Sequence, residues 1–248
     1  MMNIKLQFKG IDLRTLAIVY LALLLLFPGC TKEGGGPNPE PELTAYEQQV
    51  IEYFKAIALG FEFGSASKIT RKWESEMKIF IGGKPTEELL SELEKIRTEI
   101  NELATDGFKI SIAGDSLASN YYLFLGNAPS YVAIYPSLEN LVSSNWGLFT
   151  VFWEAGSILN SGHMYVDIER ANLQEQKHLL REELTQSLGL AMDSPQYQES
   201  IFQSAWTTTT AYAPIDRDLI RLLYHPDMQR DLNAEQVEQL LQTILLSE

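Results

Sequence analysis

An apolar segment near the start of the chain limits what the remaining residues can fold into. Lys5, Lys9 and Arg14 precede an uninterrupted run of apolar and aromatic side chains over 16–27. A membrane-spanning helix needs about 20 predominantly apolar residues, so this run is short for a span and suits the core of a signal peptide. We therefore expect the folded body to be built from the residues that follow it.

The apolar run ends in Phe27-Pro28-Gly29-Cys30, and Cys30 is the only cysteine in the sequence. A lone cysteine excludes an internal disulfide bond and a cysteine-based zinc site. Its position resembles the end of a bacterial lipoprotein signal, which implies that Cys30 is acylated and becomes the mature N-terminus at the cell envelope. Two alternatives stay open: an uncleaved signal anchor, and a transmembrane helix followed by a chance cysteine.

Composition divides the chain into three parts. Residues 31–41 are rich in Gly, Pro and Glu and cannot bury enough apolar surface to fold. We predict a signal peptide over 1–29, a flexible tether over 30–43 and a single domain over 44–248. A net charge of −14 repels phosphate backbones, so no nucleic-acid partner is expected. The expected partners are the membrane, through the lipid anchor, and a protein, peptide or glycan ligand.

Apolar periodicity predicts that the body is an α+β domain. Helical spacing indicates five helices, over 44–58, 85–107, 173–188, 214–224 and 234–246. Short apolar runs indicate strands over 77–81, 108–112, 121–125, 131–135, 148–153 and 163–168. We expect a twisted mixed sheet with helices on one side, including a long backing helix, and a helical C-terminal part.

The helix predicted over 173–188 carries the most informative residue of the chain. At about 100° per residue, its leucines form one apolar stripe, and Glu183 falls between Leu179 and Leu180. Burying an unpaired carboxylate is costly. Glu183 is therefore either paired or lines a cleft, where burial would raise its pKa.

The residues from Glu182 to Leu190 resemble the active-site helix of metzincin zinc metallopeptidases, whose pattern is His-Glu-x-x-His-x-x-Gly-x-x-His/Asp. Glu183 matches the glutamate that activates the zinc-bound water, and Gly189 matches the glycine that ends the helix. The three ligand positions hold Glu182, Gln186 and Met192, with Asp193 one residue late. The resemblance thus implies a general base, Glu183, without the histidines that hold the metal.

The donors present at these positions do not form an ordinary zinc site. Zinc favours imidazole and thiolate ligands, whereas Glu182 offers a carboxylate and Gln186 a neutral amide oxygen. An oxygen-only set that included Asp193 would suit Ca²⁺ better, and His178 could join Glu182 as an i, i+4 pair. Zinc and calcium both stay possible cofactors at this stage.

A second resemblance covers most of the chain from about Phe61 onward. It is to a bacterial family of unknown function that contains secreted proteins and lipoproteins. Its shared blocks in this sequence are Arg181 to Leu190, Asp193-Ser194, Ser200-Ile201-Phe202 and Asp216-Arg217…Leu223-Tyr224. The resemblance implies a zincin-like fold, but fold analogy does not transfer an activity.

Three functions are compatible with these residues. The first is a non-catalytic, zincin-like module on the cell envelope whose cleft binds a protein, peptide or glycan. The second is an active metallopeptidase-like hydrolase with Glu183 as general base and Glu182, Gln186, His178 or Asp193 as ligands or substrate contacts. The third is a structural envelope lipoprotein in which the helix packs shut.

Overall fold

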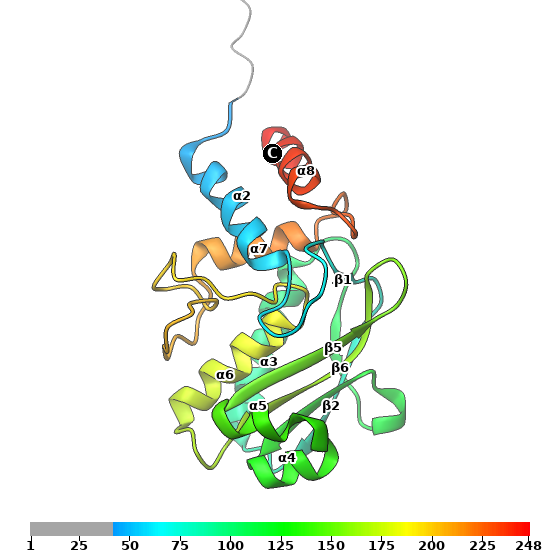
Figure 1. The fold of residues 1–248 in the computed structure, drawn as a ribbon, viewed down its shortest axis with the longest axis vertical. Helices are drawn as coiled ribbons and strands as arrows, with labels where there is room; N and C mark the ends of the chain where they lie inside the picture. Colours follow the sequence, from blue (N-terminus) through cyan, green and yellow to red (C-terminus); the bar gives the residue numbers. More distant parts are fainter. Residues whose placement is uncertain (1–41) are drawn as a thin grey trace, which may run out of the picture. The chain divides into compact units, whose positions relative to one another are not determined.

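A mixed β-sheet forms the centre of the protein in a computed structural model that describes residues 42–248 (Figure 1). The predicted signal segment, Cys30 and nearly all of the predicted tether lie outside the described residues. Five strands pair in parallel in the order β1-β6-β4-β2-β3, and β5 pairs antiparallel with β6. Their bounds are β1 Lys72–Trp73, β2 Met77–Gly83, β3 Ile110–Ile112, β4 Tyr121–Gly126, β5 Gly147–Trp153 and β6 Ile158–Asp167.

Two predicted helices begin at the residues that the sequence indicates. Thr44 caps α2 (Ala45–Ala58) through a capping box with Glu47. Thr86 accepts a hydrogen bond from the backbone N–H of Leu89 at the start of α3 (Glu87–Leu103), which is the long helix behind the sheet. Both helices bury an apolar stripe, so local capping and burial agree.

The strand predicted over 131–135 is wrong, because this segment belongs to α4 (Ala128–Ile134). Asn127 accepts a hydrogen bond from the backbone N–H of Ser130, and Pro129 lies in the first turn; both features start a helix. Three short helices precede or follow α4 along the chain: η1 (Ser116–Ala118), η2 (Pro136–Leu138) and α5 (Glu139–Ser144).

Helices cover both faces of the sheet rather than the single face that the sequence suggests. Successive residues of a strand point to opposite faces. On β4, Leu123 joins the main core, to which α3 and α6 contribute, whereas Phe124 joins a smaller apolar cluster on the other face. Tyr131 of α4 and Val142 of α5 close that cluster. The sheet is therefore buried on both sides near α4 and α5.

The C-terminal part is helical, as predicted. It comprises α6 (Leu173–Gln186), α7 (Pro214–Leu223) and α8 (Ala234–Ser247), and α2 packs against both α7 and α8 (Figure 1). The segment 187–213 between α6 and α7 is irregular apart from one β-bridge, between Ser194 and Gln203. Within residues 42–248, no helix is both long enough and apolar enough to cross a membrane.

The end of α6 is fixed by contacts that require a glycine. Trp73 Nε1 donates to the carbonyl of Ser187, and the hydroxyl of Tyr224 donates to the carbonyl of Leu188, each at 2.9 Å. Gly189 then adopts φ +115°, and a Cβ there would lie 2.1 Å from the carbonyl oxygen of Arg71. Only glycine combines this left-handed backbone with so close an approach.

We expect Gly189→Ala to lower the free energy of unfolding by about 2 kcal/mol or more, because it adds backbone strain and a steric clash. Gly114→Ala is the matched control, since a Cβ at Gly114 meets no atom within 4 Å. The control should change stability by no more than about 0.5 kcal/mol. Urea unfolding of both variants measures the difference, and equal stabilities would contradict this account of the turn.

Candidate functional site

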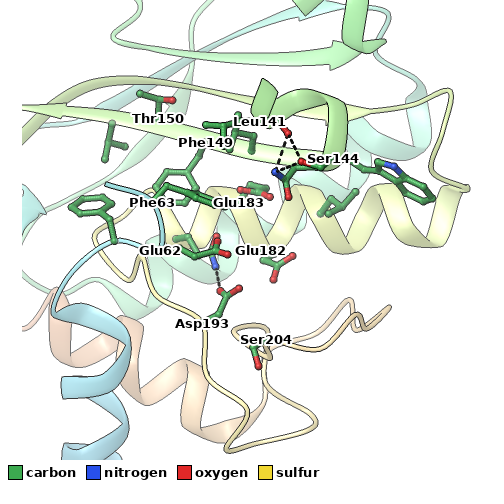
Figure 2. A pocket seen from close by; sticks show the side chains of 18 of the residues that line it. Glu62, Phe63, Leu141, Ser144, Phe149, Thr150, Glu182, Glu183, Asp193 and Ser204 are labelled. Atoms are coloured by element: carbon green, nitrogen blue, oxygen red, sulfur yellow. Dashed lines mark hydrogen bonds between the residues drawn. The ribbon is translucent and has the colours of Figure 1, made fainter. Parts of the chain in front are cut away.

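A cleft of about 1080 Å³ opens between α6 and β5 (Figure 2). In the figure, β5 runs above α6, while Asp193 and Ser204 mark the irregular segment on the opposite side. A loop after α2, which contains Glu62 and Phe63, forms a further wall. The helix that the sequence singles out is therefore part of an open cleft and is not packed shut.

Strand β5 presents its edge to this cleft. Alternate residues of a strand face opposite sides of the sheet, yet every residue from Gly147 to Val151 lines the cavity. Among the described residues, β5 pairs only with β6, so its other edge keeps free backbone N–H and C=O groups. Such an edge can accept another extended chain.

A buried ion pair sets the rotation of α6. Arg181 is 1% exposed, and its guanidinium donates to Glu92 and Glu99 of α3 at 3.0 Å each. The ring of Tyr212 lies 4.5 Å from the guanidinium carbon of Arg181 and completes its surroundings. With Arg181 held on α3, the flank of α6 that carries Glu182 and Glu183 faces the cleft.

All five site residues predicted from the sequence line the cleft: His178, Glu182, Glu183, Gln186 and Asp193. His178 Nδ1 lies 2.7 Å from the carbonyl oxygen of Thr209, and its Nε2 lies 3.3 Å from Glu182. Burial opposes protonation of His178, but the hydrogen bond and charge of Glu182 raise its pKa. Gln186 Nε2 donates to Asp193 Oδ1 at 2.5 Å.

These contacts do not fit a zinc centre. Gln186 offers only a neutral amide oxygen, and its Nε2 donates to Asp193, so this position lacks the imidazole nitrogen that zinc prefers. Within residues 42–248, no three His, Asp or Glu side chains converge closely enough to hold a metal ion. We therefore derive no step that passes through a metal.

Glu183 is a buried carboxylate in the wall of the cleft. Its side chain is buried, at 8% exposure for the residue, and forms no hydrogen bond or ion pair with any described residue. Its Oε1 lies against the backbone of Gly147, where an added Cβ would stand only 2.4 Å away. Burial, followed by the charges of Glu182, Asp193 and Glu62, raises the pKa of Glu183 well above its ordinary value.

Two further carboxyl groups in the cleft also hold their protons more tightly than usual. Burial and the nearby charges of Glu182 and Glu62 raise the pKa of Asp193 to about 7, although the hydrogen bond from Gln186 opposes the change. Burial and the charge of Glu182 raise the pKa of Glu62. Sequence reasoning missed Glu62, because it comes from a loop far from α6 in the sequence and has no recognisable motif.

Aromatic side chains line the rest of the cleft. Trp146 and Trp206 meet edge to face at 5.5 Å between ring centroids, and Trp206 is 57% exposed. Phe61 stacks on Trp153 at 5.4 Å, and the guanidinium of Arg71 lies 4.7 Å from the Trp153 ring. The cleft therefore combines acidic groups with apolar rings that can hold the body of a ligand.

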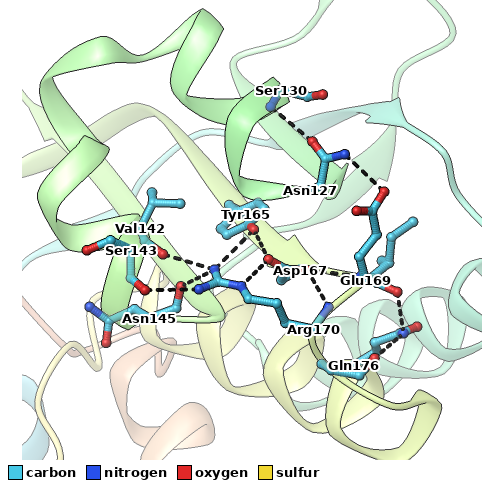
Figure 3. Close-up of polar contacts among 12 residues, drawn as sticks. Asn127, Ser130, Val142, Ser143, Asn145, Tyr165, Asp167, Glu169, Arg170 and Gln176 are labelled. Atoms are coloured by element: carbon cyan, nitrogen blue, oxygen red, sulfur yellow. Dashed lines mark hydrogen bonds and ion pairs between the residues drawn. The ribbon is translucent and has the colours of Figure 1, made fainter.

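One polar network holds the rim next to Trp146 (Figure 3). Arg170 donates to the carbonyls of Val142, Ser143 and Asn145 at the end of α5. Asp167 pairs with Arg170, and its backbone N–H donates to the carbonyl of Trp146 at 2.7 Å. These bonds connect the α5 end of the cleft to the loop that leads into α6.

The shared motif around Ser200 and Asp216 is structural. Asp216 is fully buried and accepts hydrogen bonds from Ser200 Oγ and from the backbone N–H groups of Ile201 and Ala213. The hydroxyl of Tyr53 of α2 lies 2.8 Å from Ser200 Oγ. The cluster fixes the base of the irregular wall to α7 and α2, and none of its side chains lines the cleft.

The described domain is thus a mixed α/β fold with an acidic, aromatic-lined cleft along one edge of its sheet. The family described as "Protein of unknown function (DUF2927)" matches residues 47–243. Because this match covers most of the chain, the protein belongs to that family. No curated protein matches the sequence.

The raised pKa values predict a stability that depends on pH. A carboxyl group whose pKa is higher in the folded state costs stability as the pH rises from its unfolded pKa to its folded pKa, which for Asp193 runs from about 4 to about 7. Glu183→Gln removes one such group. It should raise the free energy of unfolding by about 1–2 kcal/mol near pH 8 and leave it almost unchanged near pH 4.

Glu102→Gln is the control for this measurement, since Glu102 is exposed on α3 and its replacement removes the same charge. It should show no comparable gain at either pH. Chemical unfolding of the wild type and both variants at the two pH values gives the comparison. A loss of stability in Glu183→Gln near pH 8 would show that the carboxylate has a favourable partner in the folded protein.

Proposed function

We propose that this protein is a lipid-anchored module of the bacterial cell envelope whose zincin-like domain binds a peptide segment and does not cleave it. The fold supports the zincin-like interpretation through its mixed sheet, long backing helix and helical C-terminal part. The position of Glu182 to Gln186 in the last turn of α6, beside the sheet edge, supports it further. The proposed anchor rests on the sequence around Cys30.

The observation that carries the binding function is the state of the would-be catalytic donors. Glu182 and Gln186 stand where a zincin carries two histidines, and no three His, Asp or Glu side chains within residues 42–248 converge on a metal position, while the cleft beside them stays open. A hydrolase of this type would need free metal ligands at these positions. A binding cleft needs only a cavity of suitable shape, aromatic rings that contact the ligand and carboxylates that pair with it.

An extended peptide is the ligand that the walls favour. The free edge of β5 can pair with a peptide backbone, which supplies affinity that does not depend on sequence. Trp146, Trp206 and Phe149 line the same cavity and can receive its side chains.

One observation favours the alternative, an active hydrolase. Glu183 is unpaired, and its pKa is raised well above the ordinary value, as is common for catalytic acids and bases. Under this alternative Glu183 would act as general base, and its replacement would abolish turnover. Measurements of peptide cleavage and of bound metal on the same samples distinguish the hydrolase from the binding module.

The purified full chain should bind neither Zn²⁺ nor Ca²⁺ stoichiometrically and should not cleave a library of quenched fluorescent peptides. Elemental analysis and fluorescence give the two readouts, each before and after chelation. Metal-dependent cleavage that disappears in Glu183→Gln would establish the hydrolase and overturn the binding function.

The double variant Glu182→His, Gln186→His tests the zincin-like interpretation. Two histidines one helical turn apart face the same side and bind zinc when a third donor is near. The variant should bind Zn²⁺ at least about tenfold more tightly than a control pair, Glu94→His with Thr98→His, at the same spacing on the exposed side of α3. Equal zinc affinities would count against this interpretation of α6.

The anchor gives a separate prediction. Metabolic labelling with a fatty acid should mark the protein in its bacterial host, and Cys30→Ser should abolish the label because it removes the acceptor thiol. Thr31→Ala is the neighbouring control, since it alters the next side chain and keeps the thiol, and it should retain the label. A label that persists in Cys30→Ser would refute the lipid anchor.

A further inference from the structure

The buried carboxylates of the domain differ in one respect. Four acidic residues are buried: Glu92, Asp167, Glu183 and Asp216. Glu92 pairs with Arg181, Asp167 pairs with Arg170, and Asp216 accepts bonds from Ser200 and two backbone N–H groups. Glu183 alone has no partner among the described residues, and at 8% exposure it is the least enclosed of the four. Its carboxylate lines the open cleft, where a group of a bound ligand can pair with it.

The titratable side chains around Glu183 in the cleft are acidic, apart from His178. Its cleft also contains Glu62 and Asp193 from the neighbouring segments, and Glu175, His178 and Glu182 from α6. None of the described residues that line the cleft is Lys or Arg. Oε1 of Glu183 lies against Gly147, which has no side chain that could pair with it.

The aromatic side chains of the cleft favour an organic cation over a small hydrated ion. A small hydrated ion gains little from rings, whereas a guanidinium group stacks on them and its methylene stem packs along them. Trp146 and Trp206 stand near the same helix turn as His178, with the Trp206 ring 6.2 Å from the imidazole. Guanidinium also offers five donors in a planar fork and is weakly hydrated, so it suits several carboxylates better than an ammonium group.

We propose that the cleft contains a subsite for a basic side chain of the bound peptide, arginine in preference to lysine, and that Glu183 is the carboxylate that receives it. This inference rests on the proposed peptide-binding function and specifies its ligand. Glu182, Glu62 and Asp193 supply the surrounding negative charge.

The subsite also makes binding dependent on pH. The pKa of Asp193 is raised to about 7, so this carboxyl group holds a proton in the empty cleft at mildly acidic pH, and burial raises the pKa of Glu183 in the same direction. A bound guanidinium favours the ionised forms and releases these protons. His178, whose pKa is raised, adds positive charge at low pH and acts in the same direction. Affinity for the basic peptide should therefore increase from about pH 5.5 to about pH 8.

The test compares two blocked pentapeptides, Ala-Ala-Arg-Ala-Ala and the same peptide with citrulline, whose urea has nearly the shape of guanidinium without its charge. The full chain is titrated in detergent near pH 8, and the indole N–H resonances of Trp146 and Trp206 report binding. We expect the arginine peptide to bind at least about tenfold more tightly than the citrulline peptide. A lysine peptide should fall between them.

Three variants test whether the preference for arginine depends on the carboxylates of the subsite. Glu183→Gln and Asp193→Asn should each reduce the preference for arginine over citrulline at least about threefold, whereas Glu102→Gln, on the exposed surface of α3, should keep it. Unchanged circular dichroism spectra show that the variants are folded. Ca²⁺ or Zn²⁺ added alone should neither shift the indole resonances nor compete with the arginine peptide.

The outcomes separate this inference from the proposed function. Equal affinity for the arginine and citrulline peptides, or an arginine preference that survives Glu183→Gln, would overturn the subsite and leave peptide binding intact. Failure of all three peptides to bind would overturn both. Displacement of the arginine peptide by Ca²⁺ or Zn²⁺ would overturn the subsite by assigning the carboxylates to a metal ion.

Discussion

The ion pair of Arg181 with Glu92 and Glu99 is the interaction on which the cleft depends. It connects α6 to the long helix α3 inside the protein, where removing one partner would leave an uncompensated charge. It also selects which flank of α6 turns toward β5. Arg181 and Glu183, close together on one helix, thus have opposite environments: one charge is neutralised in the core, and the other faces the cavity without a partner.

Much of the fold follows from local sequence signals, and most of the central strands and long helices lie close to their predicted positions. Capping at Thr44 and Thr86 and the apolar stripe of α6 are decided by neighbours in sequence. The strand predicted over 131–135 is wrong because two local signals compete there. The aromatic and β-branched residues of this segment suit a strand, but Asn127 and Pro129 start a helix just before it. The two-residue strand β1 is fixed by its pairing with β6 and has no periodicity to detect.

The candidate site is predictable only where it lies on one helix. Glu182, Glu183, Gln186 and His178 share α6, and Asp193 follows it closely. Glu62, the tryptophans and the edge of β5 reach the cleft through chain folding, and single residues in loops carry no signal of that. The resemblance to a zinc site pointed to this helix from its sequence alone, whereas the hydrogen bonds of Gln186 and His178 depend on residues that the fold brings to α6.

One part of the irregular wall between α6 and α7 attaches the wall to the protein, and another part lines the cleft. Its base is held by Asp216 and Ser200 inside the protein, while its tip, residues 203–206, lines the cavity. Insertions or deletions at the tip would change the width of the entrance without moving α6, because the base does not take part in the change. Ligand size can therefore evolve through loop length, while the carboxylates of α6 are inherited unchanged with the scaffold.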